Sequence, residues 1–229
     1  MLRIICTIFL MLSFNCCFSQ IGTDDFYAGK TITLRTNPFS FFKHDAGIML
    51  GVNYRWQERW SATIDPTFIF YAIESPGNSI DPGRPLGIRV ITDVRYHIRK
   101  FIGGFENIFI SPEMTFGYVS SKKQAEFGIN CVGQNCAYYT IQEYTEIKKE
   151  AGAAIKIGLI GPIRKNNDNW KLELYSGIGV SFFDFQEKGI PPGGSFVRLP
   201  VHENILGTLE EDEPNLAIPL GLKISFRIK

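Results

Sequence analysis

Long apolar runs, histidine and an excess of charge of one sign are all scarce in this sequence of 229 residues. After residue 20, no apolar run reaches the roughly 18 residues that a transmembrane helix needs. Lysine and arginine total 24 against 23 acidic residues, and the two signs are interleaved along the chain. This balance excludes the basic patch with which proteins hold a phosphate backbone, so no nucleic-acid partner is expected.

Histidine and cysteine are too few and too dispersed to suggest a metal centre. The three histidines are His44, His97 and His202, and none is spaced to complete a site with another potential ligand. A structural metal site normally needs four ligands. The sequence therefore predicts no metal, no cofactor and no assigned catalytic residue.

The first 19 residues have the layout of a secretory signal peptide. One cation, Arg3, precedes an apolar run from Ile4 to Phe14, and small residues follow up to Ser19. This apolar core is too short to cross a bilayer as a helix. We predict cleavage before Gln20, which leaves a single domain at residues 20–229.

Cleavage would leave two of the five cysteines, Cys131 and Cys136. An even pair in an exported chain predicts a disulfide. The other three, Cys6, Cys16 and Cys17, fall in the leader, where a lipoprotein anchor on Cys16 or Cys17 is an alternative. The residue before a lipidated cysteine should be small, and neither position meets that condition. A cleaved signal peptide is therefore preferred.

From residue 30 onward, apolar side chains recur at every second position in eight segments. This period is typical of a β-strand with two unlike faces, and no convincing helix interrupts it. Each segment has about the 9 to 11 residues that a tilted strand needs to cross a bilayer, or more. The segments are Lys30–Phe41, Ala46–Trp56, Trp60–Ala72, Leu86–Arg99, Ile108–Ser120, Thr145–Ile163, Trp170–Phe185 and Leu216–Lys229.

The predicted connections between these strands alternate in length. The short ones are 57–59, 100–107 and 164–169, and the long ones are 73–85, 121–144 and 186–215. Only the short connection 42–45 breaks the alternation. Short turns at one end and long loops at the other are typical of bacterial outer-membrane barrels. The sequence therefore predicts an all-β fold, an eight-stranded antiparallel up-and-down transmembrane barrel in the bacterial outer membrane.

The face opposite the apolar one indicates which side of the strands meets lipid. It combines glycines with charges of both signs, which suits a narrow, filled interior better than a solvent-facing strand surface. Unpaired charges in such an interior would be costly, so we predict a buried ion-pair network. Its predicted members are Asp65, Arg89, Asp93, Arg95, His97, Glu113, Glu150, Lys156, Glu173 and Lys223.

The three tryptophans fall beside predicted short turns. Trp56 and Trp60 flank the turn QER, and Trp170 follows the turn RKNNDN. An aromatic belt at a membrane surface would have this placement, because the indole ring stays in the apolar boundary with its N–H near water. The pattern therefore predicts a tryptophan belt at the inner end of the barrel.

The stretch from Leu34 to Tyr71, LRTNPFSFFKHDAGIMLGVNYRWQERWSATIDPTFIFY, resembles the start of a family of small outer-membrane barrels from Gram-negative bacteria. In that family an Asn-Pro pair near the end of the first strand precedes a hairpin of the GYEYRLNDRWSL kind, matched here by Gly51–Ala62. The chain is also similar to the broader OmpA/OmpX-type eight-stranded architecture. Its last strand, Leu216–Lys229, resembles the C-terminal strand that the outer-membrane assembly machinery recognises. These resemblances imply location and shape, and carry over no catalytic residue.

The sequence favours a structural or surface-interaction role over catalysis. A filled eight-stranded interior leaves no continuous pore, so any surface ligand would bind the long outer loops. We expect a monomer whose partners are membrane lipids and the assembly machinery.

Two other functions stay open. The first is an outer-membrane lipid-modifying enzyme, either an acyl hydrolase or an acyltransferase, which would need a serine, a histidine and a carboxylate within reach of lipid. No histidine falls on the predicted lipid face, and Ser176 on that face has no base beside it. The second is a secreted, soluble lipocalin-like ligand-binding barrel, whose apolar face would point inward.

Overall fold

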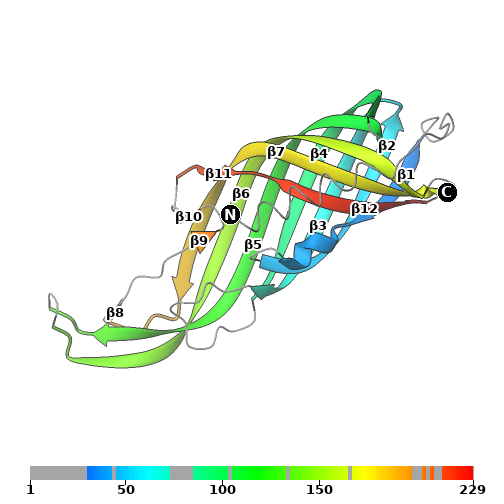
Figure 1. Ribbon diagram of the computed structural model, residues 1–229. Helices are drawn as coiled ribbons and strands as arrows, with labels where there is room; N and C mark the ends of the chain where they lie inside the picture. The colour runs from blue at the N-terminus through cyan, green and yellow to red at the C-terminus, as the bar shows by residue number, and fades with distance from the viewer. Residues whose placement is uncertain are drawn as a thin grey trace, which may run out of the picture.

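The computed structural model describes residues 30–42, 45–72, 85–102, 105–132, 135–164, 167–197, 203–204, 207–208 and 213–228. The predicted signal peptide, His44 and His202 lie outside these ranges. Antiparallel strands make up most of the part that is described (Figure 1). No helix there is long and apolar enough to span a membrane.

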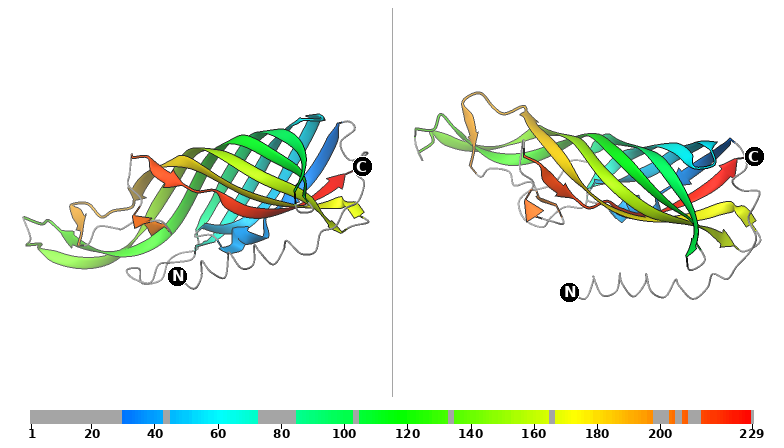
Figure 2. Two further views of the ribbon diagram at one scale, coloured as in Figure 1. Left: turned by 45° about the horizontal axis from the view of Figure 1, so that its top comes forward. Right: turned by 90° about the horizontal axis from the view of Figure 1, so that it is seen from above.

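The long strands pair in chain order and close into a ring (Figure 2). Strand β12 completes the ring, because it pairs with β7 on one side and with β1 on the other. The strands of the ring are β1 (Thr31–Thr36), β2 (Asp45–Gln57), β3 (Trp60–Ala72), β4 (Leu86–Ile102), β5 (Phe105–Ile129), β6 (Tyr138–Arg164), β7 (Asn167–Lys188) and β12 (Leu220–Ile228).

Four short strands lie in the long connection between β7 and β12. Of these, β8 (Gly194–Phe196) pairs with β5, and β11 (Asn215–Ala217) pairs with β7. The other two, β9 (Glu203–Asn204) and β10 (Gly207–Thr208), pair with each other. Part of the connection that the sequence predicts as loop is therefore strand, and β8 adds to the outer part of β5.

Because side chains alternate across each strand, the ring has an inner and an outer face. On β3, Ser61 and Asp65 are fully buried, whereas Ile64 and Phe68 are about half exposed. The same alternation recurs on the other ring strands: the buried charges lie inside together with some apolar residues such as Phe109, and most of the exposed residues outside are apolar. This distribution is the inverse of that in a soluble globular protein.

The first predicted strand, Lys30–Phe41, is longer than the strand in the structure. Strand β1 ends at Thr36, and a 3-10 turn, η3 (Pro38–Phe42), follows it. The side-chain oxygen of Asn37 accepts a hydrogen bond of 2.9 Å from the backbone N–H of Phe39, which closes the turn. The proline after Asn37 has no N–H for a strand ladder, so the turn replaces the end of the predicted strand.

Strands β5 and β6 continue far beyond the rest of the ring, and much of the predicted loop 121–144 is strand. Residues 121–129 pair with residues 138–146, whereas the pairing of β5 with β4 ends at Ser120. Two hairpin strands can continue to pair with each other after their outer neighbours end. Figure 1 shows this part, the projecting hairpin (residues 121–146), extending away from the ring.

Candidate functional site

The middle of the ring interior holds a continuous group of ion pairs. Lys156 of β6 lies 2.8 Å from Asp93 of β4 and also pairs with Glu113 of β5. Arg95 lies 2.7 Å from Asp93 and 2.8 Å from Glu173 of β7. Each of these five side chains is at most 7% exposed. Pairing offsets the cost of taking these charges out of water.

The same group continues across the ring through β1, β3 and β12. Arg35 of β1 lies 3.3 Å from Glu173 and 3.2 Å from Asp65 of β3. Lys223 of β12 donates to Asp65 at 2.7 Å. We call these eight residues the central network, and its four cations match its four carboxylates: Arg35, Asp65, Asp93, Arg95, Glu113, Lys156, Glu173 and Lys223.

A second ion-pair group lies nearer the projecting hairpin. Arg89 of β4 donates to Glu150 of β6 and to Asp45 of β2, each at 2.8 Å. Lys148 of β6 donates to Asp45 at 2.9 Å, and its ammonium lies 5.2 Å from the ring centre of Phe183. Two cations again face two carboxylates. We call this set, Asp45, Arg89, Lys148 and Glu150, the loop-end group.

The structure brings together nearly all the charged residues predicted for the interior. Seven of them belong to the central network, and Arg89 and Glu150 belong to the loop-end group. Three members of the two groups were not predicted from the sequence: Arg35, Asp45 and Lys148. Alternation with the exposed Leu34 could have identified Arg35 as inward-facing. Asp45 lies in a predicted connection, so alternation gave no signal for it.

Predicted residue His97 is in neither ion-pair group. Its Nε2 lies 2.8 Å from Oγ of Ser61, and its Nδ1 lies 3.2 Å from the side-chain nitrogen of Asn107. Asn53 donates to the same Ser61 oxygen at 3.1 Å. Nucleophilic catalysis can use a serine, an imidazole beside it and an amide that orients the imidazole. Ser61, His97 and Asn107 are each 3% exposed or less, so a substrate has no access to this serine in the structure.

Large side chains fill the interior between the charged groups. The Arg95 guanidinium lies 4.3 Å from the ring centre of Phe109, which is itself fully buried. The ammonium groups of Lys156 and Lys223 lie 5.0 and 4.8 Å from the ring centre of Tyr175. Cation–π contacts of this kind stabilise buried charge in addition to the ion pairs. The middle of the ring is therefore packed with side chains.

The outer face of the ring carries an apolar surface that runs over all its long strands. Monomeric soluble proteins rarely expose contiguous apolar patches larger than a few hundred square ångströms. The exposed side chains include Ile32, Leu34, Leu50, Val52, Ile64, Phe68, Ile88, Val94, Ile110, Met114, Phe116, Ile155, Ile157, Ile178, Val180, Phe182, Leu220 and Ile228. These residues project outward on β1 to β7 and on β12.

The three tryptophans border this apolar surface at the end opposite the projecting hairpin. Trp60 begins β3 and packs edge-on against Tyr96, with ring centres 5.1 Å apart. Trp170, near the start of β7, lies 4.9 Å from the ring of Phe226. Trp56 is the second-last residue of β2, beside the same turn as Trp60. Trp60 and Trp170 are exposed and Trp56 is partly exposed, so their rings lie on or near the surface.

The projecting hairpin has a small core of its own. Phe127 is fully buried, and the ring of Phe196 from β8 lies 4.8 Å from it. The ring of Tyr144 lies 5.2 Å from that of Phe196 and 6.0 Å from that of Phe127, so the three rings pack against one another. Burial, together with the nearby carboxylates of Glu146 and Glu187, raises the pKa of Tyr144 to about 12. The hairpin is therefore a packed element.

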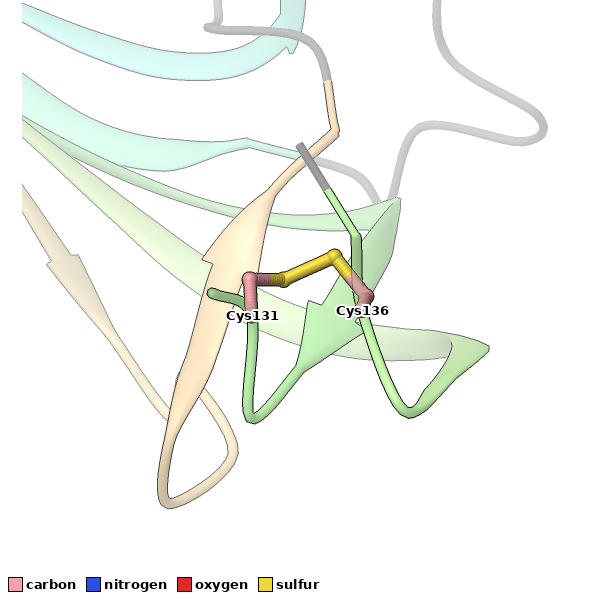
Figure 3. The surroundings of a disulfide bond; sticks show 2 residues. All are labelled: Cys131 and Cys136. Atoms are coloured by element: carbon pink, nitrogen blue, oxygen red, sulfur yellow. A yellow bond between two sulfur atoms is a disulfide. The ribbon is translucent and has the colours of Figure 1, made fainter. Parts of the chain in front are cut away.

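A disulfide closes the tip of this hairpin. Figure 3 shows Cys131 and Cys136, the predicted pair, bonded to each other. Asn130, just before the first cysteine, has a φ of 51°, a left-handed conformation that asparagine tolerates better than most residues. A Cβ added at Gly128 would collide with both sulfur atoms, so this position favours glycine.

The described residues offer no metal site, and comparisons with known proteins give no indication of function. Within the described ranges, no group of three or more histidine, cysteine, aspartate and glutamate side chains is arranged to hold a metal ion. Comparisons with family models, curated proteins and solved structures give no match.

Proposed function

We propose that the chain is a bacterial outer-membrane protein whose ring is an eight-stranded transmembrane β-barrel with a filled interior and a structural or surface-interaction role. The observation that carries this proposal is the inverted distribution of side chains, with paired charges such as Asp93 and Lys156 inside and residues such as Phe68 outside. A closed ring also satisfies its backbone hydrogen bonds internally, which a lipid environment requires.

The length of the apolar surface supports a membrane-spanning position. On β5, outward-facing residues from Ile108 to Tyr118 are predominantly apolar, and this stretch has about the 9 to 11 residues of a tilted transmembrane strand. Tyr118 pairs across strands with Lys149, which forms an ion pair of 2.7 Å with Asp184 on the outer face. This polar row is the proposed outer limit of the bilayer, and the tryptophan rings are the proposed inner limit.

The packed interior argues against a pore, and the buried Ser61 argues against an enzyme. An acyl hydrolase is the second candidate, because Ser61, His97 and Asn107 are in contact in the order of a nucleophile, a base and a residue that orients the base. The amide nitrogen of Asn107 donates to Nδ1 of His97, however, so a neutral imidazole carries its proton on Nε2 and donates to Ser61 instead of acting as its base. Lipid on the outer face would not meet this serine, however. The exposed apolar outer face also disfavours a soluble lipocalin-like barrel.

The projecting hairpin supports a surface-interaction role. The pairing of β6 with β7 ends at Thr145, so residues 138–144 pair only with β5 among the described strands. Tyr138, Tyr139 and Ile141 on this stretch are exposed. A strand edge with exposed side chains can receive an extended segment of another protein. The hairpin is therefore the proposed place of contact with surface partners.

Extraction and gel migration test the proposal. The protein should remain in the membrane fraction until detergent is added. Because a closed barrel resists unfolding by cold detergent, the unboiled protein should migrate differently from the boiled protein. Recovery as a soluble protein without detergent, with identical migration before and after boiling, would overturn the proposed membrane barrel.

A further inference from the structure

On the outer face of the ring, part of β6 carries smaller side chains than the two strands that flank it. Ala151 and Ala153 are consecutive outward-facing residues of β6, and both are exposed. Ala151 pairs with Phe116 of β5 and with Phe182 of β7, and Ala153 pairs with Met114 and Val180. These four flanking side chains are 42 to 58% exposed, so they stand above the two alanines as walls. We call this channel the β6 groove.

The β6 groove leads into a hollow in the outer face. This hollow has a volume of about 560 Å3, and its lining includes the outward-facing residues Met114, Ala153, Ile155, Ile178 and Val180. It extends from β6 towards β3 and β4, where its lining includes Ala62 and Thr92, and it also borders Asp93 and Glu113, which belong to the central network. A narrow apolar channel that ends in a wider hollow fits a hydrocarbon chain better than it fits a flat protein surface.

Three lysines lie on the same outer face, between the groove and the tip of the hairpin. Lys149 is two residues from Ala151 along β6, or roughly 7 Å. Lys122 and Lys188 flank Thr145 in one cross-strand row, so their backbones are roughly 10 Å apart. Both side chains are exposed, and neither side chain makes a hydrogen bond or an ion pair with the described residues. Lys149 pairs with Asp184, and this exposed pair is weak enough to rearrange.

We propose that the β6 groove and these three lysines bind a lipid whose bulky headgroup carries phosphate, in the leaflet on the side of the projecting hairpin. The acyl chain lies over Ala151 and Ala153, and the phosphates face the lysines. This inference rests on the proposed function, because it requires the outer face of the ring to be in lipid. The separation between Lys149 and the other two lysines requires a headgroup larger than a single phosphate.

The test uses purified protein in detergent micelles, with lipid binding measured by native mass spectrometry. The probes are diphosphoryl lipid A, monophosphoryl lipid A and phosphatidylglycerol, and diphosphoryl lipid A should bind most tightly. Charge near a membrane surface contributes about 1 kcal/mol per lysine, so removing each lysine should weaken binding about fivefold. The double variant Lys122→Gln/Lys188→Gln should therefore lose roughly 25-fold affinity for diphosphoryl lipid A if the two effects add.

Two further variants separate the acyl chain from the headgroup. Ala153→Leu fills the groove and should weaken the binding of both forms of lipid A severalfold, whereas Ser176→Leu, on the outer face of β7, should leave it unchanged. Lys30→Gln is the control for charge, because Lys30 is exposed just before β1 at the opposite end of the barrel.

Migration of the unboiled and boiled protein is measured for every variant, so loss of the proposed barrel can be distinguished from loss of the lipid site. If Lys122→Gln/Lys188→Gln keeps the affinity of the parent and the heat-dependent migration, the lipid site is wrong and the barrel proposal stands. Equal binding of all three lipids by the parent would also overturn the lipid site.

Discussion

The ammonium group of Lys156 lies 2.8 Å from the carboxylate of Asp93, and both side chains are completely shielded from solvent. The two residues come from β6 and β4, which are separated in the ring by β5. Their contact therefore passes over β5 on the inner face of the ring. Because Lys156 also pairs with Glu113, its removal would leave excess negative charge in a space with little water.

Replacing Lys156 by methionine should destabilise the protein strongly. Breaking a buried ion pair by removing one partner costs about 3 to 5 kcal/mol. The measurement is urea unfolding of the protein in detergent or lipid, with tryptophan fluorescence as the signal. Adding Glu113→Gln to Lys156→Met should restore part of the loss, because the interior then regains equal numbers of charges. A single variant as stable as the parent would show that the central network contributes little to stability.

Replacing Gly158 by alanine should also destabilise the ring. A Cβ at this position would overlap the ring of Phe109, which also packs against the Arg95 guanidinium. Overpacking of this kind costs about 1 to 3 kcal/mol. Gly117→Ala is the matched control, since its Cβ would approach only the side chain of Glu150, at 3.1 Å. Equal unfolding curves for the two variants would argue against the packing described for Phe109.

Replacing Ser61 by alanine tests the enzyme alternative. The change leaves the imidazole of His97 and the amide of Asn53 without their buried partner, which should cost about 1 to 3 kcal/mol of stability. Because Ser61 is fully buried, the acyl-chain composition of the outer membrane should be the same in cells with the parent and with the variant. An altered composition, matching that of cells without the protein, would instead identify Ser61 as a nucleophile.

Replacing Cys131 and Cys136 by serine should affect only the tip of the projecting hairpin. The disulfide closes a short segment that lies outside the ring, so its loss should leave the heat-dependent migration of the protein unchanged. Local opening at the tip should become more frequent, because a constraint on the chain there is lost. Limited proteolysis measures this, and faster cleavage between residues 129 and 138 is expected. Loss of heat-dependent migration would contradict the separation of tip and ring.

Alternation in the sequence predicted the ring better than it predicted the ends of the strands. The predicted strand Trp60–Ala72 has the bounds of β3, since its inner and outer faces differ at nearly every position. The strands β5 and β6 exceed their predictions because the projecting hairpin lies beyond the packed interior of the ring, so its two faces differ less in polarity. Its pattern includes polar residues on both faces, and its core depends on Phe196, which is distant in the sequence.

The sequence could predict that the interior charges are paired, but not which residues pair with each other. Alternation places Asp93, Arg95 and Glu113 inside, and the cost of burying charge requires that they be paired. It does not determine which partners meet, because strand register and tilt decide whether Arg95 reaches Glu173 across the ring. The hydrogen bond between His97 and Ser61 also depends on strand register, so this contact could not be predicted from the sequence.

The most direct test of the proposed membrane barrel is the accessibility of spin labels in a reconstituted bilayer. Ile64 faces outward and its neighbour Thr63 faces inward, so cysteine variants at these two positions report the two faces of β3. We expect a label at position 64 to meet oxygen dissolved in lipid and to be shielded from a water-soluble nickel reagent, whereas a label at position 63 should be shielded from both. A label at position 64 that the nickel reagent reaches as freely as it does in water would contradict the account.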